Sequence, residues 1–360
     1  MTGEYLIKPR CSAAKTPEQL FVPAAEHFCL CCGKKLYLTL PSPVHTIIAE
    51  KAQERRTMTD ILIRAGSFIA IIFLGYFLRR VGFFKKEDFH ILSKIVMRIT
   101  LPAALVCSFA GRELEYSMLL LSLLSLAFGL LMIAAAYLLN RRWGKEAQAF
   151  AIINMSGFNI GNFVLPFAQG FLGPVAVMAV SVFDVGNSFI CLGGAYGVAC
   201  MVKENGKKFS LRPILHALFR SVPFITLMCM LLISLLRIAL PKPVLEFAGI
   251  ISGANAFLSM LMVGVGFELT GDRTQLGAIV RTLLPKYLLG LLMSVVCFRF
   301  LPMPLAYRQA LAILSFAPIP SAAPAFTADM GGDYGLASAA NSIAILISII
   351  AIVATLLLVI

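Results

Sequence analysis

Charged side chains are scarce in this sequence. Asp, Glu, Lys and Arg make up 14% of the 360 residues, whereas 59% of the residues are hydrophobic. A soluble domain carries about 25% charged residues, and a soluble chain of this length needs a charged shell around its core. The shortage of charge excludes an ordinary soluble enzyme, a coiled coil and a disordered chain. Most of the chain is therefore expected to lie in a lipid bilayer.

Catalytic motifs are missing as well. The sequence contains no Gly-x-Ser-x-Gly, no His-Glu-x-x-His and no P-loop pattern. No stretch is left over to form the soluble nucleotide-binding domain of an ATP-driven pump. We therefore predict neither an enzyme nor a bound cofactor, and secondary transport or channel activity remains.

Acidic residues are fewer than basic ones, and the net charge is +13. On a soluble protein this excess would suggest a nucleic-acid partner. Here Lys and Arg are concentrated in alternate loops between apolar runs, as in the cytoplasmic loops of membrane proteins. We expect no nucleic-acid partner. The charge pattern predicts a multi-pass protein of the plasma membrane with both termini outside the cytoplasm.

Residues 1–57 differ in composition from the rest of the chain. They are rich in charge and proline, and no uncharged run among them reaches the roughly 20 residues that span a bilayer. They are interpreted as a disordered tail or as an over-extended N-terminus that precedes a true start at Met58. Cys29 and Cys32, with His27 and His45 nearby, supply only one of the two ligand pairs that structural zinc sites usually have. No metal site is predicted.

From Met58 onward the apolar pattern predicts about ten transmembrane helices. Their expected ranges are 61–79, 90–110, 117–139, 147–171, 175–201, 214–236, 246–267, 279–300, 308–328 and 334–360. The predicted organisation is a first five-helix repeat over 58–202, a cytoplasmic linker over 203–212 and a second five-helix repeat over 213–360. Because five is odd, the second repeat would be inverted in the membrane.

The fourth and ninth predicted spans are interrupted by glycine, asparagine and proline. Asn162-x-x-x-Pro166 in the fourth aligns with Pro320-x-x-x-Pro324 in the ninth at an offset of 158 residues. Proline breaks or kinks a helix, and a broken helix survives in lipid only when it is buried or lines a cavity. Paired interruptions in two inverted halves point to a transporter binding site. Simple proline kinks are the alternative.

Asp184 is the single charged side chain between Ala147 and Val202. An intramembrane carboxylate indicates a proton relay, an ion ligand or a substrate contact, although a structural hydrogen bond inside the bundle is also possible. Asn187 lies three residues further on and shares its helical face. Asn159 and Asn162 lie three residues apart near the interruption, either as substrate contacts or as caps of the broken helix. The candidate substrate-binding residues are Asn159, Gly161, Asn162, Pro166, Asp184, Asn187, Pro318, Pro320, Ser321 and Pro324.

Basic residues within the spans have simpler interpretations. Lys94 and Arg98 are expected to reach toward the membrane interface with their charged ends, with a substrate-anion role for Arg98 as the alternative. Glu268, Lys286 and Arg299 are interpreted as interfacial anchors near span ends.

Several stretches in the membrane part resemble the auxin efflux carrier (AEC) family. They are Leu74-Gly-Tyr-Phe-Leu-Arg-Arg-Val-Gly82, Leu101-Pro-Ala-Ala-Leu-Val106, Asn159-Ile-Gly-Asn-Phe-Val-Leu-Pro166 and Pro320-Ser-Ala-Ala-Pro-Ala-Phe-Thr-Ala-Asp329. The resemblance covers about 60–360 and none of the N-terminal tail. Each motif is loose by itself, and their order along the chain carries the likeness.

The resemblance implies a ten-helix fold of two inverted five-helix repeats, like that of bile-acid symporters and sodium/proton antiporters. Helices four and nine would cross at the substrate site, and a transport domain would move like an elevator against a scaffold. Family members carry small organic anions, such as auxin in plants and dicarboxylates in bacteria. Asn159 stands at the family's crossover asparagine, whereas Pro318 and Pro320 crowd a break that often has fewer prolines. The short loop between spans five and six resembles a bacterial-type permease.

The leading hypothesis is therefore a secondary transporter of a small organic anion, with a proton or sodium ion as the coupling partner where transport is coupled. A homodimer is compatible with this interpretation. The rival hypotheses are an inorganic-ion antiporter that uses Asp184, and a non-transporting membrane sensor or scaffold.

Overall fold

A computed structural model describes residues 27–28, 35–36, 43–112, 114–204, 209–268 and 275–359, and their side chains from Met58 onward. The chain divides into two compact units, Met1–Thr57 and Met58–Ile360. In the first unit, β1 (His27–Phe28) pairs antiparallel with β2 (Lys35–Leu36). The side chains considered above for zinc, those of Cys29, Cys32, His27 and His45, lie outside what the structure describes.

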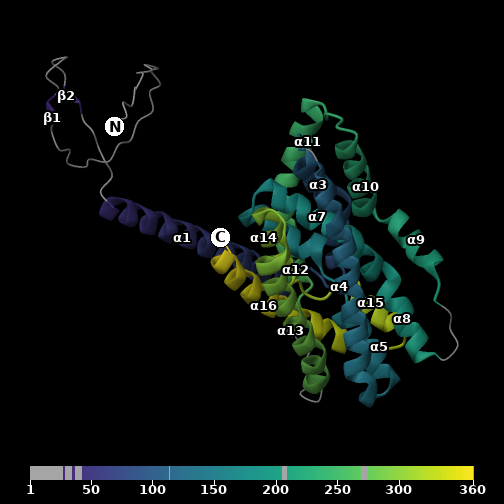
Figure 1. The fold of residues 1–360 in the computed structure, drawn as a ribbon. Coiled ribbons are helices and arrows are strands. Elements are labelled where there is room, and N and C mark those ends of the chain that lie inside the picture. The colour runs from purple at the N-terminus through teal and green to yellow at the C-terminus, as the bar shows by residue number, and fades with distance from the viewer. Residues whose placement is uncertain are drawn as a thin grey trace. The chain divides into compact units, whose positions relative to one another are not determined.

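Helices make up the regular structure of the second unit wherever it is described (Figure 1). They are α1 (Pro43–Arg80, which begins in the first unit), α2 (Asp88–Ile95), η1 (Val96–Thr100), α3 (Leu101–Phe109), α4 (Tyr116–Asn140), η2 (Arg141–Trp143), α5 (Lys145–Met155), η3 (Ile160–Val164), α6 (Leu165–Phe171), α7 (Pro174–Phe189), η4 (Ile190–Gly194), α8 (Ala195–Lys203), α9 (Leu211–Arg220), α10 (Val222–Leu235), α11 (Lys242–Gly253), α12 (Asn255–Val265), α13 (Leu276–Phe300), α14 (Leu305–Leu314), α15 (Ala323–Asp329) and α16 (Tyr334–Val359).

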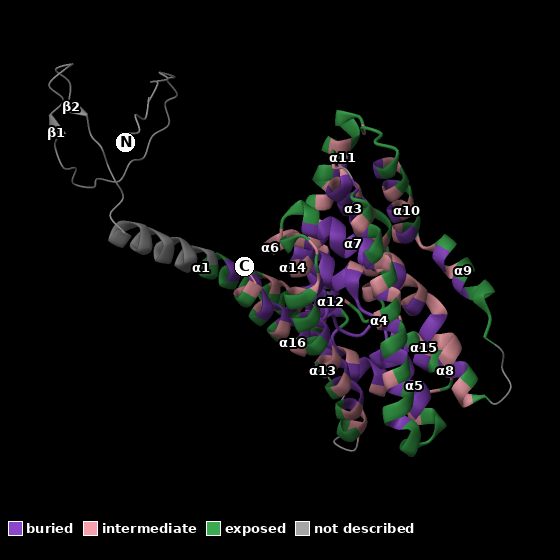
Figure 2. Ribbon diagram, viewed as in Figure 1, coloured by how far each residue is buried: buried purple, intermediate pink, exposed green. Residues whose placement is uncertain are grey.

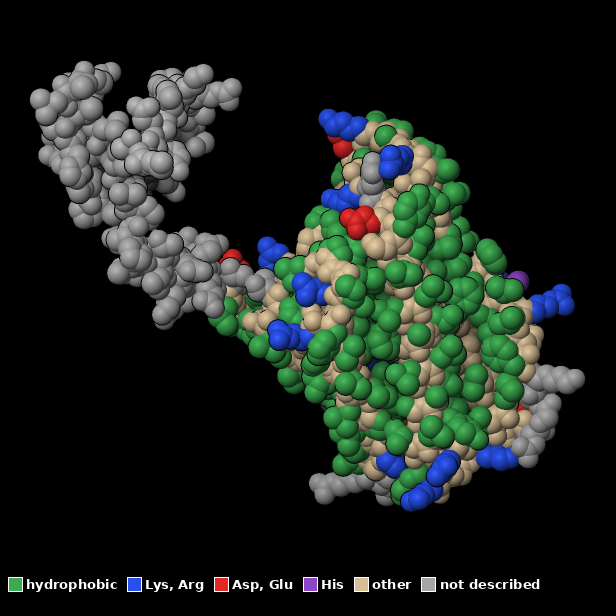
Figure 3. All heavy atoms as spheres, in the orientation of Figure 1, with side chains coloured by type: hydrophobic (Ala, Val, Ile, Leu, Met, Phe, Trp, Pro, Cys, Tyr) green, Lys and Arg blue, Asp and Glu red, His purple; other side chains and the backbone are tan. Residues whose placement is uncertain are grey.

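The described helices include seven that are long and apolar enough to cross a membrane, or up to nine if each bent pair counts as one span. The bent pairs are α5 with η3–α6, at 40°, and α9 with α10, at 78°. Hydrophobic side chains cover most of the visible face of this unit, and many of its Lys and Arg side chains lie toward the edges (Figure 3). Helices occupy all ten ranges expected from the sequence, but in the ninth range α14 has only 10 residues and α15 only 7.

Two of the helices widen into a π-helical turn just before a proline. The turn η1 ends at Thr100, two residues before Pro102, and η3 ends at Val164, two residues before Pro166. A proline inside a helix clashes with the carbonyl one turn earlier, and a π-turn makes room by adding one residue to the turn. The chain therefore continues as a helix through both prolines.

The interruption of the fourth span lies at residues 156–159, before Pro166, and includes the predicted Asn159. Helix α5 ends at Met155, Gly157 takes a left-handed φ of +79°, and the helix resumes at Ile160. Glycine adopts this φ without the steric cost that a Cβ imposes. In the ninth span the interruption covers 315–322, and Pro324 is the second residue of α15. Pro166 and Pro324 are thus located in the resumed helices.

Helix α7 lies at the centre of the buried core, as Figure 2 shows by its run of buried residues. Its contact with α4 is tight at Gly186, where an added Cβ would lie 2.0 Å from the carbonyl oxygen of Ser122. The hydroxyl of Ser122 also donates to the carbonyl of Val182, at 2.8 Å. Small residues permit such close approach of helix backbones, and packing of this kind holds helices together in membranes.

Gly186→Ala is expected to lower the midpoint of thermal unfolding in detergent. The added methyl group must push α4 and α7 apart, and overpacking of a tight core costs about 1–3 kcal/mol. Gly249→Ala is the matched control, because it adds the same methyl group to helix α11 with nothing within 4 Å. Equal melting temperatures for the two variants would contradict the tight packing of α4 on α7.

Candidate functional site

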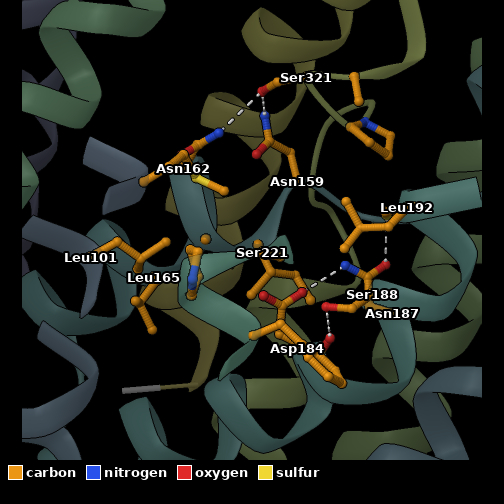
Figure 4. A pocket seen from close by; sticks show the side chains of 18 of the residues that line it. Leu101, Asn159, Asn162, Leu165, Asp184, Asn187, Ser188, Leu192, Ser221 and Ser321 are labelled. Atoms are coloured by element: carbon orange, nitrogen blue, oxygen red, sulfur yellow. Dashed lines mark hydrogen bonds between the residues drawn. The ribbon is translucent and has the colours of Figure 1, made fainter. Parts of the chain in front are cut away.

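A cavity of about 320 Å³ lies where the two interrupted segments meet α2–α3, α7 and the start of α10. We call it the crossover cavity. Its polar lining consists of His90, Ser93, Asn159, Asn162, Ser181, Asp184, Asn187, Ser188, Cys191, Ser221 and Ser321. Figure 4 shows the labelled Asn159, Asn162 and Ser321 on one side and Asp184 with Asn187 on the other.

The two interrupted segments are bonded directly to each other. The backbone N–H of Asn159 donates to the carbonyl of Pro318, at 3.1 Å. The side-chain amides of Asn159 and Asn162 both donate to the hydroxyl of Ser321, at 2.9 and 3.4 Å (Figure 4). Backbone groups freed by a broken helix need such partners, because lipid offers none. The amides therefore join the two breaks and face the cavity.

The opposite wall is formed by consecutive turns of α7. The Asn187 amide donates to the Asp184 carboxylate and to the Phe158 carbonyl, at 2.8 Å each, and its oxygen accepts from the Phe158 N–H at 2.9 Å. Asn187 thereby satisfies both backbone groups of a residue in the first break and holds Asp184 in place. Asp184 and Asn187 are three residues apart and therefore share one face of α7, which allows their side chains to bond.

Helix polarity gives the cavity a second feature. The helix after the first break starts at Ile160, and Gly161 and Asn162 of its first turn line the cavity. N–H groups in the first turn lack intrahelical acceptors and favour negative ligand groups. An added Cβ at Gly161 would lie 2.9 Å from the Leu101 side chain, which would have to move, and in ordinary contact with the Asp184 carboxylate at 4.0 Å.

Seven of the ten residues predicted from the sequence line this cavity. They are Asn159, Gly161, Asn162, Asp184, Asn187, Pro320 and Ser321. Pro166, Pro318 and Pro324 are buried but lie outside the lining. Pro318 contributes its carbonyl to the bond between the breaks. Pro166 lies within the resumed helix and Pro324 in the first turn of α15, so a substrate contact by these three prolines is not supported.

The proposed substrate-anion role of Arg98 does not fit the structure. Arg98 and Lys94 are exposed and absent from the cavity lining, whereas Ser93 and Met97 on the other face of this helix line it. No Lys or Arg of the described chain lines the crossover cavity. Nor do the described residues contain a group of three or more His, Cys, Asp or Glu that could hold a metal ion.

The interpretation of Lys286 as an interfacial anchor was wrong. Its side chain is only 2% exposed, and its ammonium group donates to the carbonyls of Met155, at 3.2 Å, and Gly157, at 2.8 Å. The Phe158 ring centroid lies 5.1 Å from the ammonium nitrogen. A cation at the C-terminal end of α5 complements the negative end of the helix dipole. The position of Lys286 in the middle third of α13, out of reach of either end, was the signal that could have revealed this role.

Comparison with protein-family models finds no match, and comparison with curated proteins finds no significant relative. The geometry of the site therefore carries the functional argument.

Proposed function

We propose that the chain is a secondary transporter of a small organic anion, of the auxin efflux carrier type, with its substrate site in the crossover cavity. The observation that carries this proposal is the bonding of two broken helices to each other beside a polar cavity. Discontinuous helices that meet near the middle of a bundle are the usual substrate sites of secondary transporters.

The proposed architecture is two inverted five-helix repeats in the plasma membrane. The contact between the breaks supports it, because Asn159 meets Pro318 at a separation of 318 − 159 = 159 residues, next to the offset of 158 between the aligned motifs. In an inverted repeat, equivalent positions of the two copies meet where they lie close to the symmetry axis. The basic residues at the ends of α4 and α8 favour the cytoplasmic side for those ends.

Substrate binding is assigned to backbone N–H groups at a helix start and to side-chain amides. A carboxylate group would be held by the first-turn N–H groups around Gly161 and by the amides of Asn159 and Asn162. The Lys286 ammonium binds the carbonyls at the end of α5. It would thereby offset their negative partial charge, which would otherwise repel an anion in the cavity. Asp184, across the cavity, is proposed to take up the coupling proton or sodium ion.

The proposed motion is elevator-like. One side of the cavity is formed by α2, η1, α3 and α10, and the other by α7 and the two breaks. The interrupted segments and α7 are linked by the bonds of Asn187 and Ser321, so they would move as one body. Sliding of this body along the first set of helices would carry the site from one membrane face to the other.

Asn159→Ala tests the assignment of the site. We expect at least a 10-fold loss of carboxylate transport in proteoliposomes, because the substrate and Ser321 both lose an amide partner. A thermal-shift screen of the purified protein against mono- and dicarboxylates first selects the transported probe, since a ligand that binds only the folded state raises its melting temperature.

Asn140→Ala is the control for the loss of a buried amide. Asn140 donates to the carbonyl of Ala136 within its own helix and does not line the crossover cavity. This variant should transport at the wild-type rate. Unchanged transport by Asn159→Ala would remove Asn159 from the site, and absence of carboxylate flux in the wild type would reject the transporter proposal.

A second candidate function is antiport of an inorganic cation. The observation in its favour is that Asp184 is the single acidic residue that lines the crossover cavity in the described chain. Amide and hydroxyl oxygens nearby add further oxygen ligands of the kind that sodium accepts. Flux that needs an ion gradient but no organic solute would favour this alternative.

A further inference from the structure

A second cavity, of about 270 Å³, lies near the C-terminal end of α4, which Arg141 and Arg142 follow directly. We call it the basic cavity. It is enclosed by the end of α4, the start of α5, the end of α8, the first turns of α13 and the segment that leads into α16. None of its lining residues lines the crossover cavity.

The guanidinium group of Arg281 is the main polar group of this cavity. Its central carbon lies 3.8 Å from the centroid of the Trp143 ring, so the guanidinium stacks on the aromatic face. Its Nη1 is buried and has no hydrogen-bond partner in the described structure. A buried donor without an acceptor is unfavourable, and an anionic ligand would supply an acceptor once the guanidinium turns toward it.

Lys203 adds a second positive charge. Its ammonium group donates to the carbonyl of Met330, at 2.9 Å, and lies 3.8 Å from the carboxylate of Glu146. These contacts fix the ammonium group beside the cavity. Lys203 thus already has two partners, whereas Arg281 still has a donor, Nη1, without one in the described structure.

The acidic residues at the same place are turned outward or already bonded. The Glu146 side chain is 86% exposed. Asp333 is exposed, and its two oxygens accept from the Leu336 N–H, at 2.9 Å, and from the Gln275 amide, at 3.0 Å. Glu146 and Asp333 line the cavity together with Lys203 and Arg281. Of these four charged groups, the guanidinium of Arg281 is the one with a buried atom that lacks a hydrogen-bond partner in the described structure.

The remaining lining is mainly apolar. Ala147, Phe150, Ala278 and Leu336 form walls beside the two basic groups. A cavity with apolar walls and one planar donor group fits a ligand with a carboxylate head and a hydrocarbon or aromatic body, because Arg binds carboxylates through two parallel N–H groups.

We propose that the basic cavity is a second binding site, which takes an amphipathic monocarboxylate with its head on Arg281 and its body against Phe150. This site is separate from the crossover site and does not depend on the transport proposal. It would bind its ligand at the membrane face where α5 and α13 begin.

Equilibrium dialysis of the purified full-length protein against radiolabelled benzoate tests the proposal. The measurement is made on Asn159→Ala protein, so that binding in the crossover cavity is weakened. We expect saturable binding that Arg281→Gln weakens at least 10-fold. Ala147→Phe, which fills the cavity without removing a charge, should also weaken binding at least 10-fold.

Arg142→Gln is the matched control, because Arg142 is an exposed neighbour that does not line the basic cavity. It should leave the affinity within 2-fold of the starting protein. No saturable binding, or equal binding by Arg281→Gln and Arg142→Gln, would overturn the proposal. Failure of carboxylate transport in the earlier experiment would leave this result unaffected, since binding is measured directly.

Discussion

Lys286→Met is expected to slow transport in proteoliposomes roughly 100-fold or more. The variant removes the ammonium group that bonds the carbonyls of Met155 and Gly157 at the first break. A hydrogen bond to a charged group contributes about 1.5–3 kcal/mol, and a loss of about 3 kcal/mol lowers a rate roughly 100-fold. The first break would lose the partner of the Gly157 carbonyl and a buried positive charge.

Methionine is chosen because it keeps the apolar stem. The variant loses two hydrogen bonds to carbonyls, but it also removes the desolvation cost of a buried charge. The two effects offset each other in part, so the variant is expected to fold. Lys242→Met is the control, because Lys242 is exposed and pairs only with Glu246 on its own helix.

Transport rate and melting temperature have to be measured together. Loss of transport at a near wild-type melting temperature would support a role of Lys286 in the site. If Lys286→Met transports at the wild-type rate, the ammonium group has no part in substrate binding or in the motion. A large fall in melting temperature would show that Lys286 mainly holds the fold.

Asp184→Asn is expected to abolish uphill transport while leaving exchange of substrate across the membrane. Asparagine keeps an oxygen that can accept from the Asn187 amide, so the wall built on Phe158 should persist. It cannot gain or lose a proton and it binds sodium poorly, so a substrate gradient could no longer be driven by an ion gradient. Accumulation and counterflow of the same radiolabelled carboxylate in proteoliposomes separate the two processes.

This variant also distinguishes the two candidate functions. An antiporter that carries its cation on Asp184 would lose all flux, whereas an anion carrier coupled through Asp184 would retain counterflow. Asp60→Asn, at an exposed position of α1, should behave as wild type in both assays. Normal accumulation by Asp184→Asn would exclude Asp184 as the coupling group.

The residues of the site were largely accessible from the sequence. Asn159 and Asp184 were found because polar groups are costly in lipid and stand out in apolar runs. The spacing of Asp184 and Asn187 predicted a shared face, and their hydrogen bond at 2.8 Å confirms it. The role of Pro166 could not be read from the sequence: the π-turn Ile160–Val164 accommodates it within the helix, and the break lies at Gly157.

By itself the sequence determined the helical, apolar character of the chain after Met58 and the two places where its helices are interrupted. These properties depend on composition and on local backbone preferences, which neighbouring residues set. The tertiary structure alone decided the partners: Asn159 bonds Pro318, Lys286 reaches Gly157 across 129 residues, and Arg281 stacks on Trp143. Such contacts follow from how helices far apart in the sequence pack, whereas spacing along the chain predicts contacts only within one helix, such as that of Asp184 with Asn187.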